Sequence, residues 1–442
     1  MITLEQQTAW CRRQLDRVTT ADPHIDWLDR IRQQARAALA RQPVMNRKQE
    51  AWRYTSVEKL LDTELFPPPL DSAPSFSALS QHAIPELDGY RLFFYNGQCL
   101  PRLTRTDRLP KGVTIGSLRD CLATEPELLF PYLGQLALQG DNLFTALNSA
   151  SINNGLLLHV GANVEVDRPI QVSFFTEGRE EQPMMIQPRH LIVLERGAKA
   201  TVVEHFAGDP KGRYFHNNLA EIMVAEDAAL SHYRLQDEAA ASYHLSSLYV
   251  RQQGRSRYRA TTISFGAGWS RTHLNTSFTG EGAACDLSGL YTVGDSQLSD
   301  FHLDVRHGVP ACTSREHFKG IAYGQGRAVF DGRVLVERQA QHSDAELKND
   351  NLMLSRNAEL DIKPQLEIHA DDVKCGHGTT VGQIEPERMF YLRSRGISTE
   401  TARRMLCQGF ASEILDRIEL EVMRDYAYGR LSAILDAEVA AE

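Results

Sequence analysis

The segment 371–380, DDVKCGHGTT, holds the side chains best suited to chemistry, because Cys375 and His377 stand two positions apart in it. Thiolate and imidazole are soft to borderline ligands that suit iron, zinc or sulfide-containing clusters. If 372–377 forms a strand, both side chains lie on one face of it, about 7 Å apart. Two donors do not complete a metal shell. A metal site here would therefore need further ligands from elsewhere, including another chain.

Two other interpretations of this pair remain open. The segment can be a capping turn whose histidine lies at an interface. A catalytic Cys–His dyad is disfavoured, because side chains on one strand run parallel and neither an orienting acid nor an oxyanion loop can be identified. His302 and His307 are five positions apart, which on a strand places them on opposite faces and argues against a shared ligand set.

Other catalytic patterns are weak. The chain contains no GxxxxGK[ST] motif, which argues against ATP hydrolysis by this chain itself. A β-helix enzyme acting on polysaccharide or as an acyltransferase would need clustered carboxylates or a histidine in a groove. Asp300, Asp304 and Asp331 are the only acids that invite this hypothesis, and they can equally be turn caps.

Composition bounds the class of protein. The 442 residues carry a net charge of -9, and 42% of them are hydrophobic. No dense basic patch indicates nucleic-acid binding, and the longest apolar runs are far shorter than a membrane span. Seven scattered cysteines without a CxxC pair are typical of free thiols in a reducing compartment. We expect a cytoplasmic protein that binds neither nucleic acid nor membrane.

Residues 155–382 predict a long all-β region. Alternating apolar residues meet turns of small or polar residues again and again, at intervals of 30, 27, 28, 44 and 31 residues between Gly197, Asp227, Gly254, Gly282, Gly326 and Asn357. The interval of 44 predicts one further turn near Gly308. Stacked coils of a β-solenoid explain this repeat, and a β-sandwich would give similar alternation. The solenoid is favoured because the region exceeds the usual length of one sandwich.

Helical segments flank this region. Apolar spacing predicts helices at 3–18, through Leu4, Ala9, Cys11 and Leu15, at 26–42 and over 47–61. A linker follows at 66–80, and residues 90–100 read as a strand that reaches an Asn-Gly turn. Three helices are expected after Glu385. The predicted organisation is a mostly helical region with a short hairpin (1–150), a β core (151–384) and a helical region (385–442).

Long motifs give the chain a family resemblance. The stretch KPQLEIHADDVKCGHGTTVGQI (363–384) resembles the SufD branch of the SufB/SufD family, which belongs to the Suf system of iron–sulfur cluster assembly. Further matching motifs run along nearly the whole chain: EAWRYTSVEKL (50–60), YTVGDSQLSD (291–300), GRAVFDGRV (326–334) and AELKNDNLMLS (345–355). The N-terminal WRYT segment favours the SufD branch over SufB.

The resemblance implies a right-handed parallel β-helix flanked by helices, and a non-catalytic scaffold role in a SufB–SufC–SufD complex. A SufB-like subunit would pair with the last β-helix strands. The C-terminal helices, at about 390–425, would dock onto SufC, an ABC-type ATPase whose closure opens the SufB–SufD interface. The interface histidine of the family matches His377, with Cys375 as a neighbour whose role is less defined. Iron or a nascent cluster would bind there transiently, with no cofactor held tightly by this chain alone.

Two further possibilities stand beside the function that the resemblance implies. The chain can form a homodimer in isolation. A homodimeric β-helix adaptor without direct metal contact is the alternative function.

Overall fold

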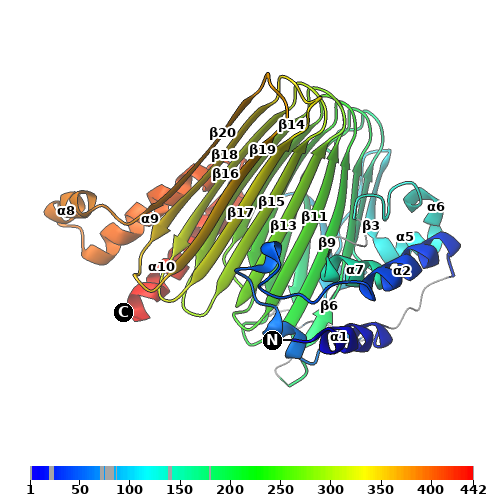
Figure 1. Ribbon diagram of the computed structural model, residues 1–442, viewed down its shortest axis with the longest axis horizontal. Helices are drawn as coiled ribbons and strands as arrows, with labels where there is room; N and C mark the ends of the chain where they lie inside the picture. The colour runs from blue at the N-terminus through cyan, green and yellow to red at the C-terminus, as the bar shows by residue number, and fades with distance from the viewer. Residues whose placement is uncertain are drawn as a thin grey trace.

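Two long sheets face each other in the computed structural model and wind together into one solenoid (Figure 1). The structure describes residues 2–18, 24–69, 74, 84–85, 87–137, 142–178 and 181–441. Most of the linker expected at 66–80 lies outside these residues. From residue 189 onward, successive strands alternate between the sheets, so each coil adds one strand to each sheet, and neighbouring strands are parallel. Near the N-terminal end of the solenoid, the strand Val113–Ser117 pairs antiparallel with Leu156–Val160.

The first sheet contains, in spatial order, β2 (Gln98–Cys99), β1 (Tyr90–Tyr95), β5 (Ile170–Thr176), β8 (Lys199–Gly208), β10 (Ala229–Asp237), β12 (Arg257–Ser264), β14 (Ala284–Val293), β16 (Thr313–Ala322), β18 (Asp344–Met353) and β20 (Lys374–Gly382). The second sheet contains β19 (Glu359–Ile368), β17 (Arg327–Val336), β15 (Leu298–His307), β13 (Trp269–Phe278), β11 (Tyr243–Gln252), β9 (Tyr214–Val224), β7 (Arg189–Leu194), β4 (Leu156–Val160) and β3 (Val113–Ser117). The short strand β6 (Met184–Ile186) pairs with β9.

Period-two alternation places apolar side chains inside the solenoid. One inner column of the second sheet runs through Ile222, Val250, Thr276, Val305, Val334 and Leu366, which are register neighbours in successive strands. Full burial of each such aliphatic side chain contributes about 1.5–3 kcal/mol. Parallel pairing between strands about 30 residues apart distinguishes a solenoid from an antiparallel sandwich. The predicted parallel β-helix core with helical flanks is thus confirmed.

The turns form two series, one on each side of the solenoid. Gly197, Asp227, Gly254, Gly282 and the expected turn near Gly308 all connect the second sheet to the first. Gly326 and Asn357 instead connect the first sheet to the second. The interval of 44 residues therefore marks a change of side, which alternation alone does not reveal because both kinds of turn have similar composition.

The N-terminal region combines short helices with a hairpin. Its helices are α1 (Leu4–Asp16), α2 (Asp26–Leu39), α3 (Glu58–Asp62), α5 (Leu118–Thr124), α6 (Pro126–Leu129) and α7 (Leu143–Ala150), with 3-10 turns at Glu50–Trp52 and Pro101–Leu103. The strand and Asn-Gly turn are confirmed, since β1 and β2 pair across Asn96 and Gly97, both with positive φ. The single helix expected over 47–61 is wrong, because a 3-10 turn and α3 divide that segment.

The predicted apolar face of the first helix is right only in part, because Cys11 is buried and Leu15 packs against the same cluster. Leu4 is 51% exposed, whereas Trp10 is fully buried, and its indole N–H donates to the carbonyl of Thr63 at 3.0 Å. A buried Trp supplies more apolar area than a Leu and also places its N–H against an acceptor. That acceptor lies far along the chain, so the choice of face is made by tertiary packing.

Three helices follow the solenoid as expected: α8 (Pro386–Ser394), α9 (Thr399–Leu415) and α10 (Glu421–Ala441). In Figure 1, α9 and α10 run beside β14, β16 and β18, and their apolar side chains cover the outer face of the first sheet. By contrast, α8 has no buried residue. Within the described part of the chain, no helix is both long and apolar enough to cross a membrane.

Candidate metal-binding interface

Cys375 and His377 lie on β20, the last strand of the first sheet. Their register neighbours on β18 are Ala345 and Leu347, both of which are buried in the solenoid core. Because register neighbours in a parallel sheet share a face, Cys375 and His377 point to the inner side of the last coil. The expected strand with both side chains on one face is therefore confirmed. No further described strand follows β20, so His377 is exposed and Cys375 is half-buried.

The last coil is an open end of the solenoid. Both β19 and β20 have a paired neighbour on one side only among the described strands, so each presents a free hydrogen-bonding edge. Pro364 in β19 fits this position, because proline lacks an N–H and is tolerated on edge strands. The inner side remains apolar up to the edge. Ile368 and Val381 are 41% and 54% exposed, which is unusual for side chains of an inner row.

The two candidate ligands differ in readiness to bind a metal. Burial raises the pKa of the Cys375 thiol above its ordinary value, and the nearby carboxylates of Asp344 and Glu316 act in the same direction. The thiol is therefore protonated at neutral pH, and a metal would have to displace that proton. The imidazole of His377 is exposed, so an ion or a partner can reach it directly. The pair offers two candidate donors, which is half of a tetrahedral metal shell.

The acids of the alternative enzyme hypothesis have structural partners. Asp300 is buried on the outer face of the second sheet, where it pairs with Arg271 and accepts a hydrogen bond from Thr55. Asp304 pairs with Arg333 at 2.7 Å, and Asp331 accepts from the side-chain amide of Gln365. All three lie within strands, so their interpretation as turn caps is wrong. All three make contacts on the outer wall of the second sheet, and Asp304 also lines a cavity together with Arg306 and Arg333.

The Arg271 site also explains the N-terminal WRYT motif. The guanidinium lies 3.8 Å from the ring centroid of Trp52 and donates to the carbonyl of Ala51 at 2.6 Å. Burial lowers the pKa of Arg271, and the Asp300 carboxylate offsets only part of that shift. The motif therefore anchors the N-terminal region to the solenoid. His302 and His307 lie on opposite faces of β15, as expected: His302 contacts Asp300, and buried His307 contacts Ser314.

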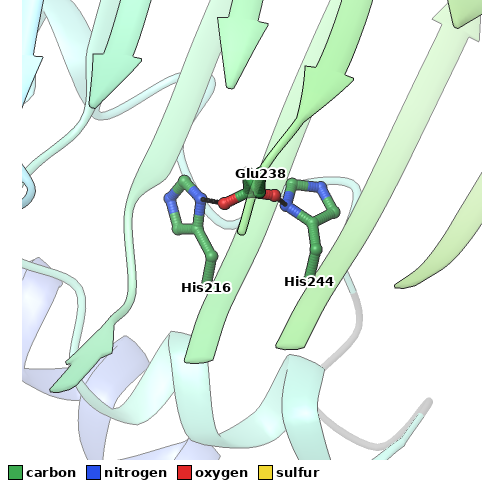
Figure 2. A group of neighbouring side chains, drawn as sticks. All are labelled: His216, Glu238 and His244. Carbon is green, nitrogen blue, oxygen red and sulfur yellow. Dashed lines mark ion pairs between the residues drawn. The ribbon is translucent and has the colours of Figure 1, made fainter. Parts of the chain in front are cut away.

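A second group of metal-ligating side chains was not predicted. Among the described residues, His216, Glu238 and His244 form the one group of three whose ligand atoms lie within 4.8 Å of one another (Figure 2). All three side chains are buried inside the solenoid. The sequence signal that could have found them is the coil repeat, because His216 and His244 are register neighbours on β9 and β11. The repeat shows which residues of successive coils are neighbours only after the pairing of the strands is known.

Fold and site together define a class: a β-solenoid with helical flanks, an open last coil and an incomplete ligand pair on its edge. Residues 174–410 match the family described as SUF system FeS cluster assembly, SufBD core domain, and residues 13–172 match the SufBD protein N-terminal region. The chain belongs to the SufBD family of iron–sulfur cluster assembly proteins.

Individual relatives agree with the family assignment. The chain is 34% identical to an iron–sulfur cluster assembly SufBD family protein of Synechocystis over 85% of its own length and 84% of the relative's. It is 31% identical to the iron–sulfur cluster assembly protein SufD of Escherichia coli, with 90% and 91% covered. Identity to the chloroplastic protein ABCI7 of Arabidopsis thaliana is 29%, with 92% and 86% covered.

Proposed function

We propose that this chain is a non-catalytic scaffold subunit of a SufB–SufC–SufD type complex, in which β20 pairs with a SufB-like subunit and His377 contributes to capture of iron or a nascent cluster. One observation carries the proposal: a metal-ligating histidine lies on the inner face of a free edge strand. A site of this kind is incomplete in one chain and becomes complete when another chain covers it.

The open end is suited to strand pairing with a partner. Edge N–H and C=O groups on β19 and β20 offer a template for added strands, and the adjoining apolar side chains would be buried on association. Ile368 and Val381 lie on this surface, next to the partly buried Leu360, Ile362 and Leu366. A partner that continues both sheets would therefore cover His377 and Cys375. Its own ligands would then complete the metal shell.

The C-terminal helices supply the second docking surface, for a SufC-like ABC ATPase. Phe390 is 74% exposed and Tyr391 is 56% exposed on α8, which contributes no buried residue to this chain. Residues 383–385 are all that separate α8 from β20. A movement imposed on α8 by a closing ATPase would thus act close to the strand that carries His377. In this proposal nucleotide hydrolysis belongs to that partner, which is consistent with the lack of a GxxxxGK[ST] motif in this chain.

The test is co-expression of the chain with SufB and SufC relatives, followed by purification through a tag on this chain. We expect both partners to co-purify, and the complex to carry iron and sulfide. His377→Ala should lower the iron and sulfide content about 10-fold or more, within the range for a lost metal contact, without loss of the partners. Cys375→Ser should have a smaller effect, because its thiol is half-buried and protonated. His342→Ala is the matched control, since His342 is an exposed histidine on the turn beside the last coil, paired with Asp372.

Two results would contradict the proposal. Full iron and sulfide content in the His377→Ala complex would remove the metal role and leave a scaffold. Failure to recover either partner, together with a stable homodimer of this chain, would favour the homodimeric adaptor without metal contact.

A further inference from the structure

The interior cluster of His216, Glu238 and His244 lies away from the open end, within the central coils. His216 follows Tyr214 in the inner row of β9, and His244 is the first inner residue of β11. Glu238 follows β10 on the turn that leads to β11. Figure 2 shows the carboxylate between the two imidazole rings, with one oxygen directed at each ring. The three side chains therefore come from two adjacent coils and meet inside the solenoid.

The ligand atoms converge on one small volume. Nδ1 of His244 lies 2.6 Å from Oε2 of Glu238, and Nδ1 of His216 lies 3.7 Å from Oε1. Neither Nδ1 atom makes a hydrogen bond of ordinary geometry, although both are buried. Metal bonds of about 2.0–2.2 Å place tetrahedral ligands roughly 3.3 Å apart, so only small side-chain movements are needed to surround an ion.

Neighbouring side chains hold the cluster in place. The ring of Phe206 packs edge-on against both imidazoles, at centroid distances of 5.4 and 5.1 Å. The Gln236 amide nitrogen donates to Oε2 of Glu238 at 3.1 Å, while its oxygen accepts from the Ser264 hydroxyl at 2.9 Å. The backbone N–H of Gly266 also donates to that oxygen, at 3.3 Å, which fixes which end of the amide faces the carboxylate. Such outer contacts orient ligands in metal sites.

A neighbouring carboxylate shows what a purely structural glutamate looks like in this interior. Glu204 is buried against the Arg234 guanidinium at 2.7 Å and against His232 at 3.2 Å, so its charge is compensated. Glu238 has no arginine or lysine within ion-pair distance in the described part of the chain; its ion pairs are with the two histidines alone. A divalent cation would supply the missing positive charge.

We propose that His216, Glu238 and His244 bind one divalent transition-metal ion, Fe(II) or Zn(II), inside the solenoid. Two imidazoles with one carboxylate form a ligand set that zinc and non-haem iron sites both use. A cavity of about 360 Å³ lies near the cluster, because Ile186 lines this cavity and is also the register neighbour of His216. The site is independent of the open end, since it uses neither His377 nor Cys375.

The experiment uses the full chain with His377→Ala and Cys375→Ser, which removes the surface donors. Under anaerobic conditions it is titrated with Fe(II), Zn(II), Co(II) and Mg(II), by calorimetry and, for Co(II), by visible absorption. We expect one equivalent of Fe(II), Zn(II) or Co(II) to bind, with Mg(II) much weaker. X-ray absorption of the bound ion should report nitrogen and oxygen ligands without sulfur. The relative affinities of Fe(II) and Zn(II) distinguish the two ions.

Variants locate the ion. Glu238→Gln and His244→Gln should each weaken binding about 10-fold or more and abolish the rise in melting temperature that the ion gives. His307→Gln is the matched control, because His307 is also a buried inner histidine but lies outside the cluster. Absence of binding to the parent chain, sulfur ligands in its spectrum, or undiminished binding in both cluster variants would overturn the proposal. The X-ray absorption measurement uses the chain with an intact cluster, so its result does not depend on whether the cluster variants fold.

Discussion

The central coils around His216 and the open last coil around His377 place the same kind of side chain in opposite settings. His216 has a further coil on each side of it, and its ring is packed and buried. His377 occupies the equivalent inner row on β20, but no described strand covers it. In the first setting three candidate ligands come from this chain, and in the second two do.

This difference follows from how a solenoid is built. Each coil buries its inner row only because the next coil stacks on it, so the terminal coil leaves the same row exposed. Polar groups in the interior must hydrogen-bond to partners within the chain, whereas those at the open end can bind another molecule. In this fold, the position of a coil decides whether a candidate site is enclosed by the chain or left open to a partner. The predictions below test whether burial, charge and association follow this division.

The largest expected contrast is between two apolar register neighbours, Phe330 in β17 and Ile362 in β19. Phe330 is fully buried, so Phe330→Ala should reduce the free energy of unfolding by about 3–5 kcal/mol. Ile362 is only partly buried, and Ile362→Ala should cost the isolated chain less than about 1.5 kcal/mol. Urea unfolding followed by circular dichroism measures both values. Equal costs would mean that the last coil is as well packed as the interior.

The second prediction concerns Glu316, a buried carboxyl on β16 whose register neighbour Leu347 in turn pairs with His377. Burial raises the pKa of Glu316 to about 8, and the Ser314 hydroxyl and the Arg315 guanidinium offset only part of that shift. The folded chain therefore retains a proton that the unfolded chain releases near pH 4.5. The contribution of Glu316 to stability is therefore highest below that pH, falls as the pH rises toward 8, and then levels off.

In Glu316→Gln the side chain at this position is uncharged at every pH. The variant should therefore not show the loss of stability that deprotonation of Glu316 causes as the pH rises. At pH 7 the free energy of unfolding of the variant should exceed that of the parent by roughly 3 kcal/mol. This figure is about 1.4 kcal/mol per pH unit, taken over the interval from pH 4.5 to pH 7. The advantage should shrink toward zero near pH 5. Thermal melts across this range measure it, with Glu281→Gln on an exposed turn as the control. A constant difference at all pH values would show that Glu316 does not titrate as a buried acid.

Sequence patterns predicted the solenoid because its repeat is local: alternation, small turn residues and a spacing near 30 residues are all visible along the chain. They also placed Cys375 and His377 on one face of a strand, which needs only the period of two. The features that were missed depend on pairing. Asp300 accepts its hydrogen bond from Thr55, 245 positions away, and Trp10 gains its acceptor from Thr63. His216, Glu238 and His244 meet only when β9, β10 and β11 are stacked in register.

The third prediction is a loss of association at the open end. Val381 shares the inner row of β20 with His377 and is 54% exposed in this chain. Val381→Asp should leave the unfolding free energy within about 0.5 kcal/mol, because the new charge stays in water. In a complex with a SufB relative the same charge would be buried without a partner, so affinity should fall about 100-fold or more. Biolayer interferometry with the purified relative measures the affinity.

Val381→Thr separates charge from shape, because threonine nearly preserves the volume of valine. We expect it to weaken the complex far less than Val381→Asp does. If Val381→Asp binds with the parental affinity, the partner does not cover the inner row of β20. The ligand pair of Cys375 and His377 would then stay open to solvent in the complex, and the division between a closed interior site and a shared terminal site would not hold.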